Sequence, residues 1–153
     1  MKHSIAHVGL AVVFAFAMMA GLAMPAHASD HTCTLANLSG NYAFSQSGFE
    51  SPNDPGQKPQ PFTNVGVVTF DGAGNFSFSL TDMSPGNPDR YLPLQLTGTG
   101  TYTVNSDCTG SASITTGPAA GGTLNLVVIG GGAEVFGINT TPWVIAASDF
   151  KKQ

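Results

Sequence analysis

Apolar and polar residues alternate with a period of two along much of the chain beyond residue 40. The segment Phe76–Thr81 reads Phe-Ser-Phe-Ser-Leu-Thr, and Ser111–Thr115 reads Ser-Ala-Ser-Ile-Thr. A period of two over segments this short is typical of half-buried β-strands, because successive side chains point to opposite faces of a sheet. No segment of this region has the sustained apolar spacing at three and four residues that predicts a helix. The sequence therefore predicts an all-β fold.

Turn-forming residues divide the alternation at regular intervals. Asp71–Asn75 carries two glycines, Asn105–Gly110 is mostly polar, and Gly130–Gly132 is a run of three glycines. Glycine adopts positive φ at no steric cost, so such segments are typical of tight hairpins. The sequence predicts eight strands in a meander, over Asn41–Ser47, Val65–Phe70, Phe76–Thr81, Thr97–Val104, Ser111–Thr116, Thr123–Ile129, Glu134–Ile138 and Trp143–Ala147.

Two proline-rich segments are expected to be surface loops. Ser51–Pro61 holds four prolines, which cannot donate to a sheet ladder and so exclude a central strand. Ser84–Asp89 holds two more. Neither segment marks a domain boundary, so residues 29–153 are expected to form a single domain.

Eight consecutive antiparallel strands leave unpaired edges unless the sheet closes or folds into two layers. We expect an eight-stranded antiparallel up-and-down barrel, because the short connections favour pairing between consecutive strands. A two-sheet sandwich is the alternative, although sandwiches usually need long crossings between their sheets.

The N-terminus has the order of regions that defines a secretory signal peptide. Lys2 supplies positive charge, Val8–Met24 is an apolar stretch, and Ala26–Ala28 is an A-x-A cleavage site. We expect cleavage after Ala28, which would leave Ser29 as the N-terminus of a periplasmic or secreted protein. No later apolar run is long enough for a transmembrane helix, so the mature chain is expected to lack a membrane span.

The charge balance argues against one large class of partner. The chain has nine acidic residues and five basic ones, and Lys2 would leave with the signal peptide. Nucleic-acid binding needs a basic face that neutralises phosphates, and the few remaining cations cannot form one.

The two cysteines, Cys33 and Cys108, are expected to form a disulfide, because export takes them into an oxidising compartment. The alternatives are a redox pair or a metal site. Redox cysteines usually stand two residues apart, and a metal site needs more His and Cys than the mature chain supplies. The sequence therefore predicts no metal site, and it contains no motif for a cofactor.

Several segments resemble an uncharacterised family of small exported bacterial proteins. They span nearly the whole mature chain and are Cys33–Leu35, Leu38–Phe44, Val68–Asn75, Gly100–Gly110, Gly131–Val135 and Lys151–Gln153. The family is similar to β-barrels of the allene oxide cyclase and lipocalin-like (calycin) type. The resemblance implies a barrel and assigns no active site.

Few residues of the mature chain suit catalysis. His31 is its one histidine, and no serine stands in a recognisable nucleophile motif. The weak candidates for a general base are Glu134, at the start of a strand, and Glu50, at the expected barrel mouth, since a carboxylate at a dry mouth can have a raised pKa. The alternative, which we favour, is that each is a solvated residue at a strand end.

Aromatic residues on the expected strands give the best argument for binding. They are Phe70 and the seven residues expected to contact a ligand, namely Tyr42, Phe44, Phe76, Phe78, Tyr102, Phe136 and Trp143. Small eight-stranded barrels are either filled by such side chains or hold one small ligand.

These observations predict an exported barrel that binds a small, largely apolar molecule without catalysis. The alternatives are a cyclase or isomerase acting inside the barrel, where shape and one carboxylate could suffice, and a structural or interaction protein of the cell envelope. An aromatic cavity with Glu134 or Glu50 pointing inward favours catalysis. A cavity without an inward carboxylate favours binding, and a filled interior favours the structural role.

Overall fold

The structure is a computed structural model that describes residues 32–51, 58–84 and 93–153. The predicted signal peptide, His31 and most of the two predicted proline-rich loops lie outside the described residues.

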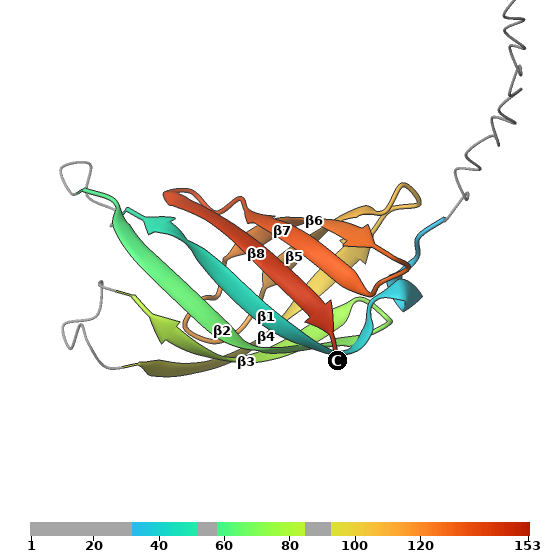
Figure 1. The fold of residues 1–153 in the computed structure, drawn as a ribbon, viewed down its shortest axis with the longest axis horizontal. Helices are drawn as coiled ribbons and strands as arrows, with labels where there is room; N and C mark the ends of the chain where they lie inside the picture. Colours follow the sequence, from blue (N-terminus) through green and yellow to red (C-terminus); the bar gives the residue numbers. More distant parts are fainter. Residues whose placement is uncertain (1–31, 52–57, 85–92) are drawn as a thin grey trace, which may run out of the picture.

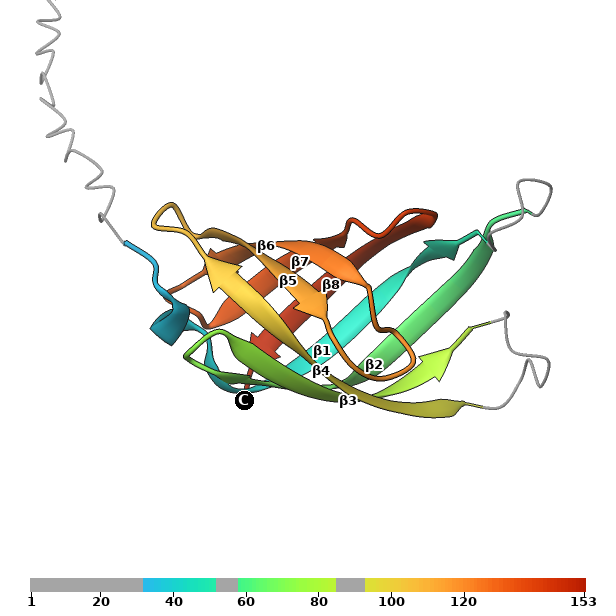
Figure 2. The same ribbon diagram turned by 180° about the vertical axis from the view of Figure 1, so that it is seen from behind.

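Eight antiparallel strands form a closed barrel in which each strand pairs with its neighbours in sequence and β1 pairs with β8 (Figure 1, Figure 2). A short 3-10 helix, η1 (Leu35–Asn37), precedes the barrel. The strands are β1 (Ser39–Glu50), β2 (Gln60–Asp71), β3 (Asn75–Met83), β4 (Leu94–Val104), β5 (Thr109–Ile114), β6 (Thr123–Ile129), β7 (Glu134–Asn139) and β8 (Val144–Lys152). The predicted up-and-down barrel is confirmed, and the sandwich alternative is wrong.

The first proline-rich loop is shorter than the sequence predicts. Gln60 and Pro61 belong to β2 and lie opposite Glu50 and Phe49 of β1. Proline is tolerated there because it stands at the start of a strand, where few ladder hydrogen bonds are needed.

The two ends of the barrel differ, and we call them the capped end and the loop end. At the capped end, the hairpin turns 72–74, 105–108 and 130–133 connect β2 to β3, β4 to β5 and β6 to β7. The helix η1 lies beside these turns, at the right of Figure 1. The loop end is the opposite one, where β1 ends and β2 begins.

Aromatic side chains pack the interior at the capped end. Leu38 and Tyr42 are fully buried there. The ring of Phe70 stands edge-on to the rings of Tyr42 and Tyr102, at centroid distances of 5.2 and 5.0 Å. Tyr42 Oη donates to the carbonyl of Gly132 at 2.6 Å, and Tyr102 Oη donates to the carbonyl of Leu38 at 2.8 Å. Both phenols therefore fix the backbone that closes this end.

The predicted disulfide is confirmed. Cys33 and Cys108 are bonded, which joins the segment before η1 to the turn between β4 and β5. The N–H of Cys33 also donates to the carbonyl of Ser106 at 3.2 Å. The disulfide indicates an oxidising compartment, such as the periplasm or the extracellular space.

The outer surface has a polar part and an apolar part. Outward positions of β3, β4 and β5 are mostly Ser and Thr. The strands β6, β7, β8 and β1 expose large apolar side chains instead, among them Val127, Phe136, Ile138, Ile145 and Phe49. Four of these residues form two cross-strand pairs. Val127 lies opposite Phe136, and Phe49 lies opposite Ile145.

Candidate ligand-binding site

A cavity of about 490 Å³ occupies the loop-end half of the barrel interior. Small-molecule sites generally have volumes of roughly 300–1,000 Å³, so this cavity is large enough for one small ligand. Phe70 also lines the cavity and separates it from the packed capped end. The apolar lining includes Phe44, Phe76, Phe78, Ile114, Leu124 and Phe150.

Glycines on the inner face of β4 leave room for the cavity. Gly100 lies opposite Phe76 in the β3–β4 pair, and Gly98 lies opposite Phe78. A Cβ atom on Gly100 would lie 2.3 Å from Cζ of Phe76, and one on Gly98 would lie 2.5 Å from Cζ of Phe78. Both rings therefore lie against the backbone of β4, and the centre of the barrel stays open.

The connection between β5 and β6 folds back and contributes residues 118–122 to the cavity wall. The N–H of Gly121 donates to the carbonyl of Ile114 at 2.9 Å, and the N–H of Thr115 donates to the carbonyl of Thr99 at 2.8 Å. These hydrogen bonds hold the connection against β4 and β5. This side of the cavity is consequently formed by backbone and small side chains.

A row of polar side chains lies on the opposite side of the barrel interior, and we call it the polar row; three of its four members line the cavity. Its members lie directly opposite one another on β8, β1, β2 and β3 and are Ser148, Gln46, Asn64 and Asp82. Gln46 Nε2 donates to Ser148 Oγ at 3.1 Å, and Asn64 Nδ2 donates to Gln46 Oε1 at 3.1 Å. If the Asn64 amide turns by half a rotation, its Nδ2 donates to Oδ1 of Asp82 instead. The row therefore provides hydrogen-bond partners for its own members.

Among the described residues, two carboxyl groups line the cavity, Asp82 from β3 and Glu50 from the end of β1. Asp82 is only 9 % exposed. Burial raises the pKa of Asp82 above its ordinary value of 3.8, and the negative charge of Glu50 adds to this effect. Ser84 Oγ donates to Glu50 Oε1 at 2.5 Å. The site can therefore accept hydrogen bonds from a ligand, and Asp82 can donate one when it is protonated.

The structure places five of the predicted ligand-contacting residues inside the barrel, in two groups. Phe44, Phe76 and Phe78 line the cavity. Tyr42 and Tyr102 are buried at the capped end, beyond Phe70, which forms the floor of the cavity. Their hydroxyl groups donate to backbone carbonyls. The tyrosines therefore support the closed end of the barrel.

Phe136 and Trp143 lie outside the barrel, which corrects their predicted placement. Phe136 is 46 % exposed and Trp143 is 63 % exposed. Gly137 faces the interior in place of Phe136, and Phe150 and Leu126 lie 3.3 and 3.4 Å from where its Cβ would be. Trp143 lies in the turn before β8, with a φ of 70°, and is not part of the strand.

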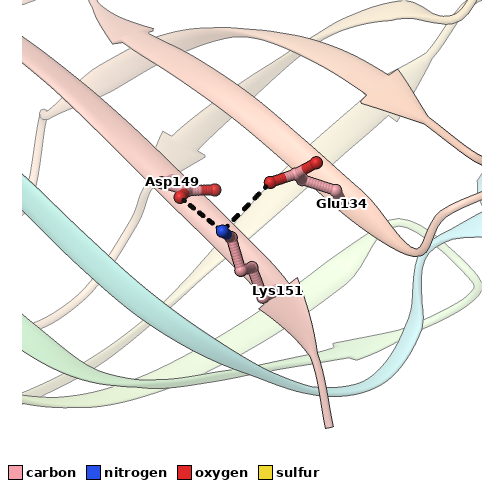
Figure 3. Close-up of polar contacts among 3 residues, drawn as sticks. All are labelled: Glu134, Asp149 and Lys151. Carbon is pink, nitrogen blue, oxygen red and sulfur yellow. Dashed lines mark ion pairs between the residues drawn. The ribbon is translucent and has the colours of Figure 1, made fainter.

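Glu134 also lies on the outer surface, so it cannot act as a base inside the barrel. Its strand neighbour Val135 is fully buried, and Glu134 points the other way. Lys151 Nζ lies 3.4 Å from Glu134 Oε1 and 3.5 Å from Asp149 Oδ2 (Figure 3). The carboxylate of Asp149, followed by that of Glu134, raises the pKa of Lys151. Of the two predicted candidates for a base, only Glu50 lines the cavity.

Several polar cavity residues have no counterpart among the sequence predictions, among them Asp82, Gln46 and Asn64. The pattern contains a signal for the first two. Continuing the alternation of Phe76–Leu80 by two residues leads to Asp82, and continuing it from Phe44 by two residues leads to Gln46. Asn64 faces inward because every second residue of β2 points to the interior.

The described parts of the chain hold neither a cluster of metal ligands nor a membrane-spanning helix. No group of three or more His, Cys, Asp or Glu side chains there is arranged to hold a metal ion. No helix there is long and apolar enough to cross a membrane.

Comparisons with known proteins show a similarity of fold. Neither a protein-family model nor a curated protein matches this chain. Among solved structures, the chain is similar to a de novo designed fluorescence-activating β-barrel, with a TM-score of 0.50 and 13 % sequence identity. The match covers 78 % of this chain and 98 % of the designed chain. At this level of identity the similarity shows the shared barrel fold.

Proposed function

We propose that the protein binds a small, largely apolar molecule in the loop-end cavity. The observation that carries the proposal is the contrast between the two halves of the barrel, since the capped half is packed and the other half encloses about 490 Å³. Rings of Phe44, Phe76 and Phe78 on its wall suit an apolar guest. The designed barrel of similar fold is described as fluorescence-activating, which agrees with a barrel interior that receives a guest.

A substitution that fills the cavity tests this proposal. Ala112 faces the cavity, whereas Ala43 faces outward on β1. Protein purified without detergent should bind a neutral solvatochromic dye such as Nile red, and Ala112→Leu should weaken binding by about tenfold or more. Ala43→Leu, the matched control, should leave the affinity unchanged. Equal binding by both variants, or no binding by the wild type, would contradict the proposal.

A second candidate function is acid–base catalysis of a cyclisation or isomerisation inside the barrel. One observation favours it: two carboxyl groups, Glu50 and Asp82, line an aromatic cavity. A carboxyl group with a raised pKa suits proton transfer near neutral pH. If the protein converts a polyene or an epoxide, and Glu50→Gln or Asp82→Asn abolishes turnover, this function replaces simple binding. Turnover that survives both substitutions would exclude these two residues as the acid and base.

We further propose that the protein is exported to the periplasm or out of the cell, and that its signal peptide is cleaved after Ala28. The disulfide and the A-x-A site at Ala26–Ala28 support this proposal. So does the resemblance to small exported bacterial barrels of the calycin type. The intact mass of exported protein should correspond to a chain beginning at Ser29. A product that retains the apolar segment Val8–Met24 would contradict it.

A further inference from the structure

We propose that the guest of the loop-end cavity is an organic cation with an apolar body, whose amine group lies between Glu50 and Asp82. This inference rests on the proposed binding function and names the chemical class of the ligand.

The charges that line the cavity are of one sign. Glu50 and Asp82 are both acidic, and none of the described lining residues is basic. Their hydrogen-bond partners among the described residues are neutral, since Ser84 Oγ donates to Glu50 and the Asn64 amide, once turned, donates to Asp82. A charge removed from water is stabilised most by an opposite charge. A bound cation would supply the opposite charge that the described wall lacks.

The protonation behaviour of Asp82 agrees with this arrangement. Burial, followed by the negative charge of Glu50, raises the pKa of Asp82. Both effects oppose the ionised form, and a cation placed between the two carboxyl groups would counteract both of them. An ammonium group at this place would therefore stabilise the charged form of Asp82.

The remaining wall fits the apolar part of such a molecule. Phe44, Phe76 and Phe78 present aromatic rings to the same cavity. Aromatic faces bind apolar groups and also attract ammonium groups through the ring quadrupole. A carboxylate ligand would meet two like charges instead, so the site should discriminate against anions.

Three probes that share one ring system separate charge from shape. They are 2-naphthylmethylamine, 2-naphthalenemethanol and 2-naphthoate, which at neutral pH are cationic, neutral and anionic. Their affinities can be measured by calorimetry with the disulfide-bonded mature protein. The amine should bind about tenfold or more tightly than the alcohol, and the acid should bind most weakly.

Variants then assign the preference to the two carboxyl groups. Asp82→Asn and Glu50→Gln should each lower the affinity for the amine while the affinity for the alcohol persists, which also shows that the barrel is intact. Glu134→Gln, on the outer surface, is the matched control and should leave both affinities unchanged.

The outcomes distinguish this inference from the function on which it rests. If the alcohol binds and the amine binds no more tightly, the cation proposal is wrong and the apolar binding function stands. A preference for the amine that persists in the Glu50→Gln, Asp82→Asn double variant would also overturn the cation proposal. If none of the three probes binds, both proposals fail.

Discussion

Asn64 lies directly opposite Asp82 across the β2–β3 pair, and its amide can donate a hydrogen bond to the Asp82 carboxylate. In the other orientation the Asn64 nitrogen donates to Gln46 at 3.1 Å and its oxygen faces the carboxyl group. The first arrangement suits an ionised Asp82, and the second suits a protonated one. The polar row can therefore accommodate either charge state of an acid that is buried beside an apolar cavity.

The first prediction concerns the cost of this buried acid. Because the folded chain raises the pKa of Asp82, the folded state holds the proton more tightly than the unfolded state. The resulting stability is fully present below the ordinary pKa of 3.8 and is lost as the pH rises through the raised value. At neutral pH the raised pKa of Asp82 therefore costs stability, and Asp82→Asn should raise the urea midpoint.

The groups around Asp82 affect how its contribution to stability changes with pH. Among the described residues, Glu50 on β1 is charged, Asn64 on β2 is neutral, and Leu94 and Leu96 of β4 are apolar. The advantage of Asp82→Asn should shrink as the pH falls toward 3.8. An advantage that is absent at neutral pH, or that grows on acidification, would contradict the prediction.

Asp71 provides a control of opposite sign. Hydrogen bonds from Asn75 and Ala73 lower the pKa of Asp71 in its hairpin turn. Its contribution to stability is present above its ordinary pKa and is lost as the pH falls through the lowered value. Asp71→Ala should therefore lower the urea midpoint at neutral pH.

The second prediction concerns the glycines that keep the cavity open. A Cβ on Gly98 would lie 2.4 Å from the carbonyl oxygen of Thr116 and 2.5 Å from the ring of Phe78. Gly98→Ala should cost about 1–3 kcal/mol of stability through overpacking. It should also weaken guest binding by displacing Phe78 into the cavity. Thr99→Ala, at an outward position of the same strand, should leave guest binding unchanged; a similar loss in both variants would contradict the assignment.

The third prediction separates the capped end from the site. Tyr102 Oη donates to the carbonyls of Leu38 and Leu35, at 2.8 and 3.1 Å. Tyr102→Phe leaves those buried carbonyls without this donor, so it should lower the free energy of unfolding by about 1–3 kcal/mol. Guest affinity should stay at the wild-type value, because the hydroxyl lies beyond the cavity floor. A large loss of affinity with no loss of stability would contradict this division of the barrel.

The fourth prediction concerns the disulfide. Cys33 and Cys108 are 75 residues apart in sequence, so the bond restricts a long loop of the unfolded chain. The Cys33→Ser, Cys108→Ser double variant should lose about 2–5 kcal/mol of stability and keep the barrel. Thermal unfolding measures the loss, and wild-type protein under reducing conditions is the control. Two free thiols in the native protein, or an unchanged melting temperature, would contradict it.

The strands were predictable because their signals are local. Alternation over six residues and glycine-rich turns are visible without knowledge of the partner strand, and β6 begins and ends at the predicted residues Thr123 and Ile129. The disulfide was predictable because the mature chain has only two cysteines. Strand ends were less so, since β1 continues to Glu50 only because β2 extends equally far beside it.

The site was predictable only in part, because the direction in which a side chain points depends on register. In β7, apolar residues occupy both phases, and the larger ones, Phe136 and Ile138, face outward. A Cβ at position 137 would lie 3.3 Å from Phe150 and 3.4 Å from Leu126, so the space there is tight, and both residues belong to other strands. The sequence pattern of β7 alone does not show which side chains of other strands lie near position 137. The pairing of β7 with its neighbouring strands decides which of its side chains face inward.

A second hollow, on the outside of the barrel, competes with the cavity for an apolar guest. This groove of about 520 Å³ is lined by exposed side chains such as Phe49, Ile138 and Ile145. Dye binding alone would not distinguish the two places, because both are apolar. The position of the guest must therefore be observed directly.

Nuclear Overhauser effects between a bound neutral probe, 2-naphthalenemethanol, and assigned side chains test the central claim. We predict contacts from the naphthalene protons to Phe78, Ile114 and Leu124, which line the cavity inside the barrel. Contacts confined to Phe49 and Ile145 of the outer groove, or the absence of any contact at saturating probe, would contradict the account.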